Sequence, residues 1–142
     1  MAQQQESFTN FNFVVEIDGI TIASFLEVSG LESTIEVIEY RVGNSPALPV
    51  QKIPGRTRYA NLVLKSGVTD NDELFKWHQE WASGATTDRK QVRVVLLDAG
   101  GIEKRSWSIR RAWPAKYVGP TFNALANEVA IETIELAHEG FE

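Results

Sequence analysis

The stretch FNFVVEIDG at residues 11–19 decides the fold class of this chain. Its apolar side chains Phe11, Phe13, Val15 and Ile17 recur at every second position, with polar residues such as Glu16 between them. A repeat of two residues is typical of a β-strand with one buried face. The pair Asp18-Gly19 is a tight-turn signal, and residues 20–28 resume the strand pattern. The sequence therefore predicts that the chain opens with two strands joined by a turn.

Working outward from this start, most of the remaining chain also has strand character. Residues 31–42 are rich in β-branched side chains, and residues 59–65 alternate between apolar and polar. Residues 92–98 and 102–111 flank the turn sequence DAGG, which predicts a hairpin. We expect a break or a sheet edge at Trp113-Pro114, a short continuation over 116–118, and a last strand over 127–138. The alternation slips between Ile131 and Ile134, which predicts a bulge or burial on both faces.

One segment has a helical repeat instead. Asp70 is predicted as the N-cap residue, and Glu73 completes a capping-box-like pair with it. The side chains that share one helical face follow at spacings of three and four: Leu74, Trp77, His78 and Trp81. Ser83-Gly84 ends the pattern. A helix of this length is marginal in water by itself, so we expect it to pack on the strands.

Two segments do not fit either repeat. Residues 1–10 are polar and are predicted to form a flexible N-terminal arm. Residues 43–55 contain Pro46, Pro49 and Pro54, and because proline lacks a backbone donor we expect an extended loop without regular sheet pairing. A loop of this length in a compact domain is usually functional or disordered.

The expected elements total about seven strands and one helix, which defines an α+β, mostly β domain. We expect a curved β-sandwich or small barrel with one packed helix, forming a single domain over 1–142. The formal net charge of −5 without a basic block argues against a nucleic-acid-binding protein. The chain has no cysteine, which excludes disulfides and thiol catalysis. Neither a signal peptide nor a membrane-spanning run is recognisable, so folding in the cytoplasm is expected.

Few residues of the sequence fit a catalytic or cofactor-binding motif. The two histidines, His78 and His138, lack zinc-binding spacing, and we expect neither a metal nor a cofactor. Glutamates recur in two runs, which predicts solvent-facing strand positions more than an acid–base pair. The tryptophans of the helix are expected in the core, because aromatic side chains dominate protein cores and interfaces. We therefore expect a protein that is not an enzyme.

A set of short strings in the chain resembles the T4-type phage tail tube protein family. FNFVVEIDG at 11–19 and FLEVSGL at 25–31 are followed by EYRVG at 39–43, KIPG at 52–55 and YANLVLKSG at 59–67. Leu74 with Trp77, AWPAK at 112–116, and NEVAIE through ELAHEG at 127–140 complete the order. The similarity spans nearly the whole chain, and it is greatest to inner-tube subunits of phage-like extracellular contractile injection systems.

This resemblance implies a structural role. Subunits of the family join their sheets into a ring barrel, hexameric rings stack into a hollow tube, and a contracting sheath drives the tube through a target envelope. Expected partners are further copies of the chain, the sheath protein, baseplate or tube-initiator and terminator proteins, and cargo in the lumen. The particle would be assembled in the cytoplasm of the producing bacterium, and would either be released or act from inside the cell.

Candidate contact residues for this role lie mostly in and around the predicted proline-rich loop. The candidates for contacts between subunits or rings are Tyr40, Arg41, Pro46, Pro49, Lys52, Pro54, Arg56, Trp113 and Lys116. The candidates that would face the lumen are Glu36, Glu128 and Glu132. Two alternatives stay open at this point: a monomeric β-rich module that binds a small ligand or carbohydrate, and a hydrolase with a carboxylate pair.

Overall fold

The computed structural model describes residues 11–18, 20–22, 25–41, 43, 49–126 and 129–142. These ranges contain one helix and nine strands. The strands are β1 (Asn12–Ile17), β2 (Ile20–Ile22), β3 (Phe25–Ser29), β4 (Ser33–Tyr40), β5 (Gln51–Tyr59), β6 (Leu62–Gly67), β7 (Lys90–Leu97), β8 (Glu103–Val118) and β9 (Ile131–Ala137). The helix α1 (Glu73–Ala82) lies between β6 and β7 in the chain. The predicted mostly β fold with one packed helix is confirmed.

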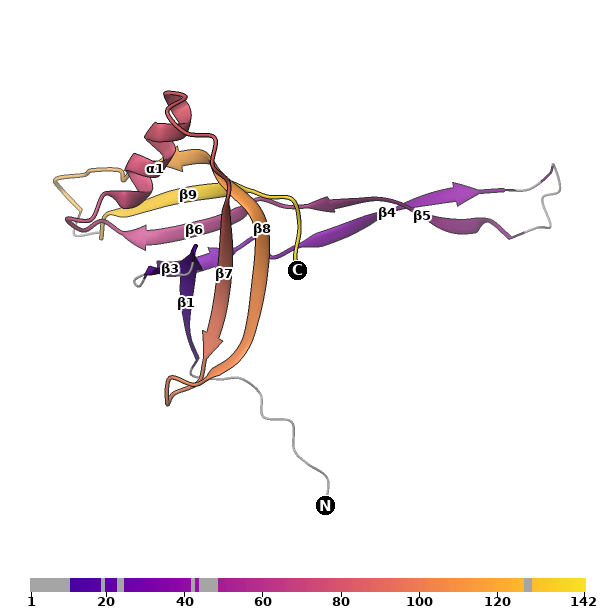
Figure 1. Cartoon of the computed structure of the whole chain (residues 1–142), viewed down its shortest axis with the longest axis horizontal. Coiled ribbons are helices and arrows are strands. Elements are labelled where there is room, and N and C mark those ends of the chain that lie inside the picture. The colour runs from indigo at the N-terminus through magenta and orange to yellow at the C-terminus, as the bar shows by residue number, and fades with distance from the viewer. Residues whose placement is uncertain (1–10, 19, 23–24, 42, 44–48, 127–128) are drawn as a thin grey trace, which may run out of the picture.

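Seven strands form one antiparallel sheet in the order β2-β1-β7-β8-β9-β6-β3. The long strand β8 joins its two halves, because residues up to Ala112 pair with β7 and residues from Trp113 onward pair with β9. Arg111 has a positive φ of 51°, and register shifts lie on both sides of it. Bulges bend a strand and increase its twist. The two halves therefore cross at a steep angle, as Figure 1 shows for β7 and β9.

The hydrophobic core lies between these two halves and the helix. The first half contributes Val15, Val94 and Ile109, whereas Leu64 and Leu136 come from the second half. Leu74 and Trp77 of α1 are buried in the same cluster, which confirms that the helix packs on the sheet. We call the seven-stranded sheet together with α1 the body.

The strands β4 and β5 form a separate two-stranded sheet. They pack mainly against each other, and Figure 1 shows this hairpin extending far from the body. We call the paired strands β4 and β5 the arm. The chain residues 30–32 and 59–61, where the arm meets the body, are called its root.

The structure corrects the predicted loop over 43–55. Residues 51–55 belong to β5, and Pro54 is paired within the arm opposite Val37. The pairing shifts register just beyond this proline, since Ile35 pairs with Thr57 and Val37 with Pro54. A bulge leaves a residue outside the regular ladder and so tolerates a missing backbone donor. Most of the remaining segment, like the predicted N-terminal arm 1–10, lies outside the described residues.

Further element predictions also needed correction. The predicted break at Trp113-Pro114 is wrong, because β8 runs through it with the missing donor of Pro114 beside a register shift. The predicted irregularity near Ile131 is wrong as well, since β9 alternates regularly and its buried positions are 132, 134 and 136. The predicted strand over 20–28 is two strands, β2 and β3. The N-cap residue is Asp72 and not the predicted Asp70, and the side chain of Asn71 accepts a hydrogen bond from the Glu73 amide (3.0 Å).

Candidate functional site: the arm and its root

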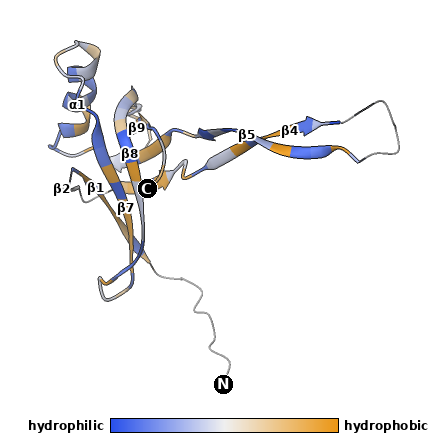
Figure 2. Cartoon of the chain, turned by 45° about the vertical axis from the view of Figure 1, so that its right-hand side comes forward, coloured by the Kyte–Doolittle hydropathy of each residue, from blue (hydrophilic) through white to orange (hydrophobic). Residues whose placement is uncertain are grey.

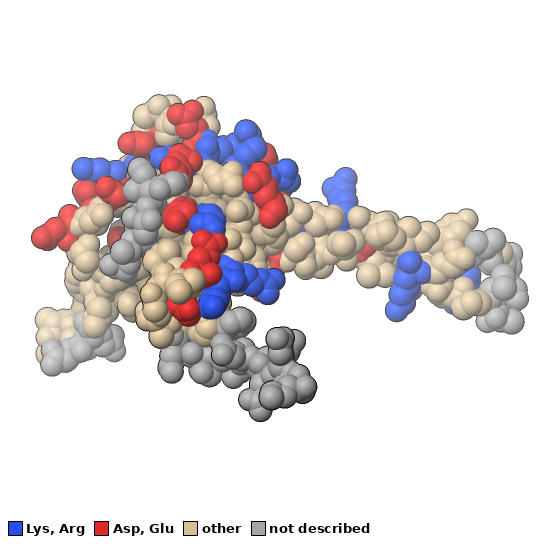
Figure 3. All heavy atoms as spheres, turned by 60° about the horizontal axis from the view of Figure 1, so that its bottom comes forward, with Lys and Arg blue, Asp and Glu red and all other residues tan. Residues whose placement is uncertain are grey.

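The arm exposes several large apolar side chains to solvent. Its exposed large side chains are Ile35, Val37, Ile38, Tyr40 and Ile53. Figure 2 shows hydrophobic stretches along the arm, and in the view of Figure 3 charged groups gather on the body while only a few lie on the arm. Exposed apolar patches of this kind mark sites of interaction with other proteins.

The apolar residues of the arm lie on both of its faces. Ile35 and Val37 are two positions apart and lie on one face of β4, whereas Ile38 and Tyr40 lie on the other. A strand pair that packs on one side alone would carry polar residues on its second side. The arm is therefore suited to contacts on both sides at once.

The fit between the two strands of the arm depends on Gly55. A Cβ atom at this position would lie 3.0 Å from Cδ1 of Ile38 and 3.3 Å from Cβ of Glu36. Glycine lets the backbone approach these side chains closely at the bulge. Across the strands, the Glu36 carboxylate pairs with the Arg58 guanidinium.

The root holds the arm against the body through close backbone contacts. Gly30 has a φ of +88°, and a Cβ atom there would collide with the backbone oxygen of Asn61. The Ala60 amide donates to the Glu32 carbonyl (3.4 Å), and the Ala60 carbonyl lies 2.9 Å from Nε2 of His138. No local sequence pattern predicts this contact, because Ala60 and His138 are 78 positions apart.

The body offers two open sheet edges for further pairing. Within the described residues, β2 and β3 are the terminal strands of the seven-stranded sheet, and each pairs with one neighbour. An unpaired strand edge can pair with a strand of another chain unless the edge is blocked. A second apolar surface lies in the β8–β9 connection, where Phe122, Leu125 and Val129 are exposed.

Four of the nine predicted contact residues lie on the arm, and two more lie just beyond it. Tyr40, Lys52, Pro54 and Arg56 are exposed on β4 and β5. Arg41 and Pro49 are exposed just beyond the paired strands, and Pro46 lies outside the described residues. The structure thus places six of the nine candidates on the arm or directly beside its strands, whereas the exposed apolar residues of the arm were not singled out from the sequence.

The remaining two candidates, Trp113 and Lys116, lie on the body in β8. Trp113 stacks on Trp81 of the helix, with ring centroids 5.2 Å apart, and the Arg89 guanidinium lies 5.9 Å from both rings. Its indole therefore helps to fix α1 within the subunit. Lys116 is exposed and pairs with Glu135 of β9 (3.5 Å).

The three residues predicted to face the lumen lie in different surroundings or outside the described residues. Glu36 is on the arm, and Glu128 lies outside the described residues. The prediction for Glu132 does not fit the structure, because only 8% of this residue is exposed. Its carboxylate accepts hydrogen bonds from the hydroxyls of Tyr117 (2.7 Å) and Ser66 (3.3 Å). This glutamate is buried by the inward alternation of β9.

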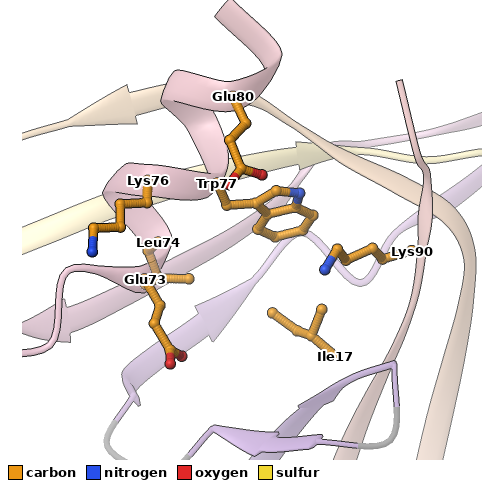
Figure 4. Close-up of a pocket in the computed structure, with 7 residues that line it drawn as sticks. All are labelled: Ile17, Glu73, Leu74, Lys76, Trp77, Glu80 and Lys90. Atoms are coloured by element: carbon orange, nitrogen blue, oxygen red, sulfur yellow. The ribbon is translucent and has the colours of Figure 1, made fainter. Parts of the chain in front are cut away.

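A hollow of about 310 Å³ lies between α1 and the first half of the sheet (Figure 4). Ile17, Leu74 and Trp77 supply its apolar lining. Glu73, Glu80, Lys76 and Lys90 also line it, and the ammonium of Lys90 lies 5.8 Å from the Trp77 ring. With charges of both signs and no cluster of catalytic groups, it has the character of a surface depression and not of an active site.

Across the described part of the chain, no group of three or more His, Asp or Glu side chains could hold a metal ion. The same residues include no helix that is both long and apolar enough to cross a membrane.

An exposed apolar arm and open sheet edges define a protein built for contacts with other chains. A family model supplies the particular class. The model of the T4-like virus tail tube protein gp19 matches residues 9–142, and the chain belongs to this family. No curated protein sequence matches the chain significantly.

Several solved structures share the fold of this chain. A chain in a structure of the PVC extracellular contractile injection system, a sheath–tube complex in the extended state, is 27% identical with a TM-score of 0.78. The match covers 92% of this chain and 86% of that one. A chain in the tube-terminating cap of the anti-feeding prophage is 24% identical with a TM-score of 0.85, over 100% of this chain and 93% of the other. Hcp1 from Flavobacterium johnsoniae shares the fold at 16% identity and a TM-score of 0.56, with 89% of each chain covered.

Proposed function

We propose that this chain is the structural subunit of the inner tube of a contractile injection system. Copies of it form hexameric rings, and the rings stack into a hollow tube that a sheath surrounds and propels. The observation that carries the proposal is the match of the tail tube family model to residues 9–142. It is supported by the similarity to a sheath–tube complex at 27% identity.

The arm is proposed as the main contact between subunits. Its apolar side chains lie on both faces and have little to pack on within their own chain. Contacts with neighbouring copies would bury them, at about 25 cal/mol per Å² of apolar surface removed from water. The predicted contact residues Tyr40, Lys52, Pro54 and Arg56 would then lie in these interfaces.

The open edges of the body are proposed to close the ring. If β2 or β3 of one subunit pairs with a neighbour, the repeated sheet forms a closed barrel without exposed edges. Such a head-to-tail contact closes into a ring when its rotation divides a full turn, and rings can stack further. Glu36 remains a candidate for a lumen-facing position, whereas Glu132 is buried within the subunit.

Sheath, baseplate and terminator proteins are the proposed partners, with cargo carried in the lumen. This assignment rests on the similar chains, which occur in a sheath–tube complex, a baseplate and a tube-terminating cap. The subunit would be assembled in the cytoplasm of the producing cell as part of an extracellular particle. A catalytic activity is not part of this role.

The proposal is tested by negative-stain electron microscopy of the purified chain over a range of concentrations. Rings or hollow tubes of uniform width are expected, either from the chain alone or after co-production with the baseplate and sheath proteins of the same system. A monodisperse monomer under both conditions would contradict the proposal and favour the monomeric binding module. In that case the hollow beside Trp77 would be the first place to look for a ligand.

A further inference from the structure

His138 connects the C-terminal end of the body to the root of the arm. Its Nε2 lies 2.9 Å from the Ala60 carbonyl oxygen, and its Nδ1 lies 3.2 Å from the Gly140 amide nitrogen. A carbonyl oxygen only accepts and a backbone amide only donates. The imidazole therefore has to be neutral, with its proton on Nε2 and a lone pair on Nδ1.

The ring is also enclosed by aromatic side chains. The Tyr59 and Phe141 rings lie 5.7 Å and 5.6 Å from it, and they meet each other edge to face at 5.5 Å. Burial lowers the pKa of the His138 imidazole, and the hydrogen bond to Ala60 opposes this effect only in part. The surroundings thus favour the neutral form that the two hydrogen bonds require.

Residues 138–142 attach this histidine to the body. Gly140 accepts a hydrogen bond from the Arg110 amide (2.8 Å), and the Glu139 amide donates to the Arg110 carbonyl (3.0 Å). The Glu142 amide donates to the Ser108 carbonyl (2.9 Å). On the opposite side, Tyr59 ends β5. His138 therefore lies between a segment fixed on β8 and the end of an arm that has few other contacts with the body.

We propose that residues 138–142, which include His138, form an acid-sensitive clasp. The clasp fixes the arm to the body at neutral pH and releases the root of the arm when the His138 imidazole is protonated. Protonation places a hydrogen on Nδ1, where it faces the hydrogen of the Gly140 amide. The hydrogen bond from Gly140 is then lost, and a positive charge remains among Tyr59 and Phe141. A role in assembly rests on the proposed function of the arm, but the clasp is a property of the single subunit.

Charged groups on the surrounding elements are already engaged. Glu139 pairs with Arg111 of β8 (2.6 Å) and with Arg89 (4.0 Å). Arg110 donates to the Glu139 carbonyl (3.3 Å). The remaining ionisable groups near the root are Tyr59, Arg58, which pairs with Glu36, and the exposed Glu32. Histidine is the side chain whose ordinary pKa places its change of charge between pH 7.5 and 5.0, so the imidazole is the group that the proposal invokes.

The sign of the effect follows from proton linkage. A base whose folded pKa lies below its ordinary value of 6.5 binds fewer protons in the closed state than in the open one. The clasp is then fully stable above pH 6.5 and loses stability as the pH falls below this value. Between pH 7.5 and 5.0 the equilibrium constant for opening rises by at most about 30-fold, the limit for a closed state that does not protonate.

Hydrogen exchange of the purified full chain at pH 7.5 and 5.0 tests the clasp. After correction for intrinsic exchange, amides in 59–61 and 138–142 should lose protection on acidification by up to about 30-fold, whereas amides of β7 should not. The substitution His138→Gln should abolish this pH step, because glutamine does not titrate. His78→Gln is the matched control and should retain the step.

Nitrogen-15 NMR of the histidines provides a second readout that needs no variant. It should show the Nε2–H tautomer of His138 at neutral pH and a titration midpoint below 6.5. A midpoint at or above 6.5, the other tautomer, or an equal pH step in His138→Gln would overturn the proposal. If the clasp responds to pH as expected but the chain forms no rings, the clasp proposal stands and the proposed tube function is refuted.

Discussion

Gly30 illustrates how one residue fixes the start of the arm. Its φ of +88° is unfavourable for other residues, and the Asn61 carbonyl occupies the space where a side chain would begin. Gly101 has a similar φ of +81°, but a Cβ atom there would meet nothing within 4 Å. A comparison of substitutions at the two glycines therefore separates the cost of backbone strain from the cost of steric exclusion.

We expect Gly30→Ala to destabilise the subunit by about 2 kcal/mol more than Gly101→Ala. Both variants incur the cost of a left-handed residue, about 1–2 kcal/mol, and only Gly30→Ala adds overpacking against backbone. Urea unfolding followed by circular dichroism measures the difference. Equal loss of stability in the two variants would show that the contact with Asn61 relaxes freely.

The buried Glu132 makes Tyr117 a second sensitive residue. Burial raises the pKa of Tyr117 to about 12, and the hydrogen bond to Glu132 and its negative charge add to the effect. Because the folded state holds this proton more tightly than the unfolded state, the stability it contributes is present below pH 10 and is lost between pH 10 and about 12. Ultraviolet titration should show one of the three tyrosines ionising near the upper value.

Tyr117→Phe removes a donor from a buried carboxylate, so we expect a loss of about 1.5–3 kcal/mol near neutral pH. The additional loss of stability above pH 10 should shrink in this variant. Tyr40→Phe is the control, because Tyr40 is exposed on the arm. A variant as stable as the wild type would mean that water replaces the hydroxyl at Glu132.

At the scale of elements, the arm separates folding from assembly. Val37 and Ile38 are 64% and 51% exposed, so they contribute little to the stability of the isolated subunit. Replacing both with glutamate should change its stability by less than about 1 kcal/mol, since exposed sites tolerate substitution. The same change should prevent rings and tubes, because it would bury two carboxylates between subunits.

Sedimentation and electron microscopy measure assembly, and thermal unfolding measures stability. Ile102→Glu serves as the matched control, because Ile102 is 63% exposed but lies at the β7–β8 turn and not on the arm. Tubes formed by the doubly substituted arm would exclude it as the main contact between subunits.

The elements that the sequence predicted well are those with a strong local repeat. The alternation of residues 11–17, the apolar run at 92–98 and the turn at 98–101 correspond to β1, β7 and the β7–β8 hairpin. The predictions failed at prolines, because each proline was interpreted without regard to the strand that pairs with it. Pro54 and Pro114 both lie inside strands, because register shifts nearby accommodate the missing donor. A register shift depends on both strands, so neither sequence segment reveals it alone.

At the scale of the whole molecule, we predict a hexameric ring with a mass of about 95 kDa, six times the 15.9 kDa chain. Native mass spectrometry of the assembled fraction measures this value directly. Cross-links between the arm and the body should appear between subunits rather than within one. A closed ring with a different number of subunits would keep the tube role but refute the six-fold symmetry.

The sequence by itself determined the mostly β class, the amphipathic helix and the family, because periodicity and ordered motifs are local properties. The tertiary structure alone decided that β4 and β5 leave the body as an arm, that Glu132 is buried, and that His138 contacts Ala60. Each of these depends on contacts between residues far apart in the chain. Burial and hydrogen bonding are set by which segments meet in space, and the local repeat of a strand does not specify its partner.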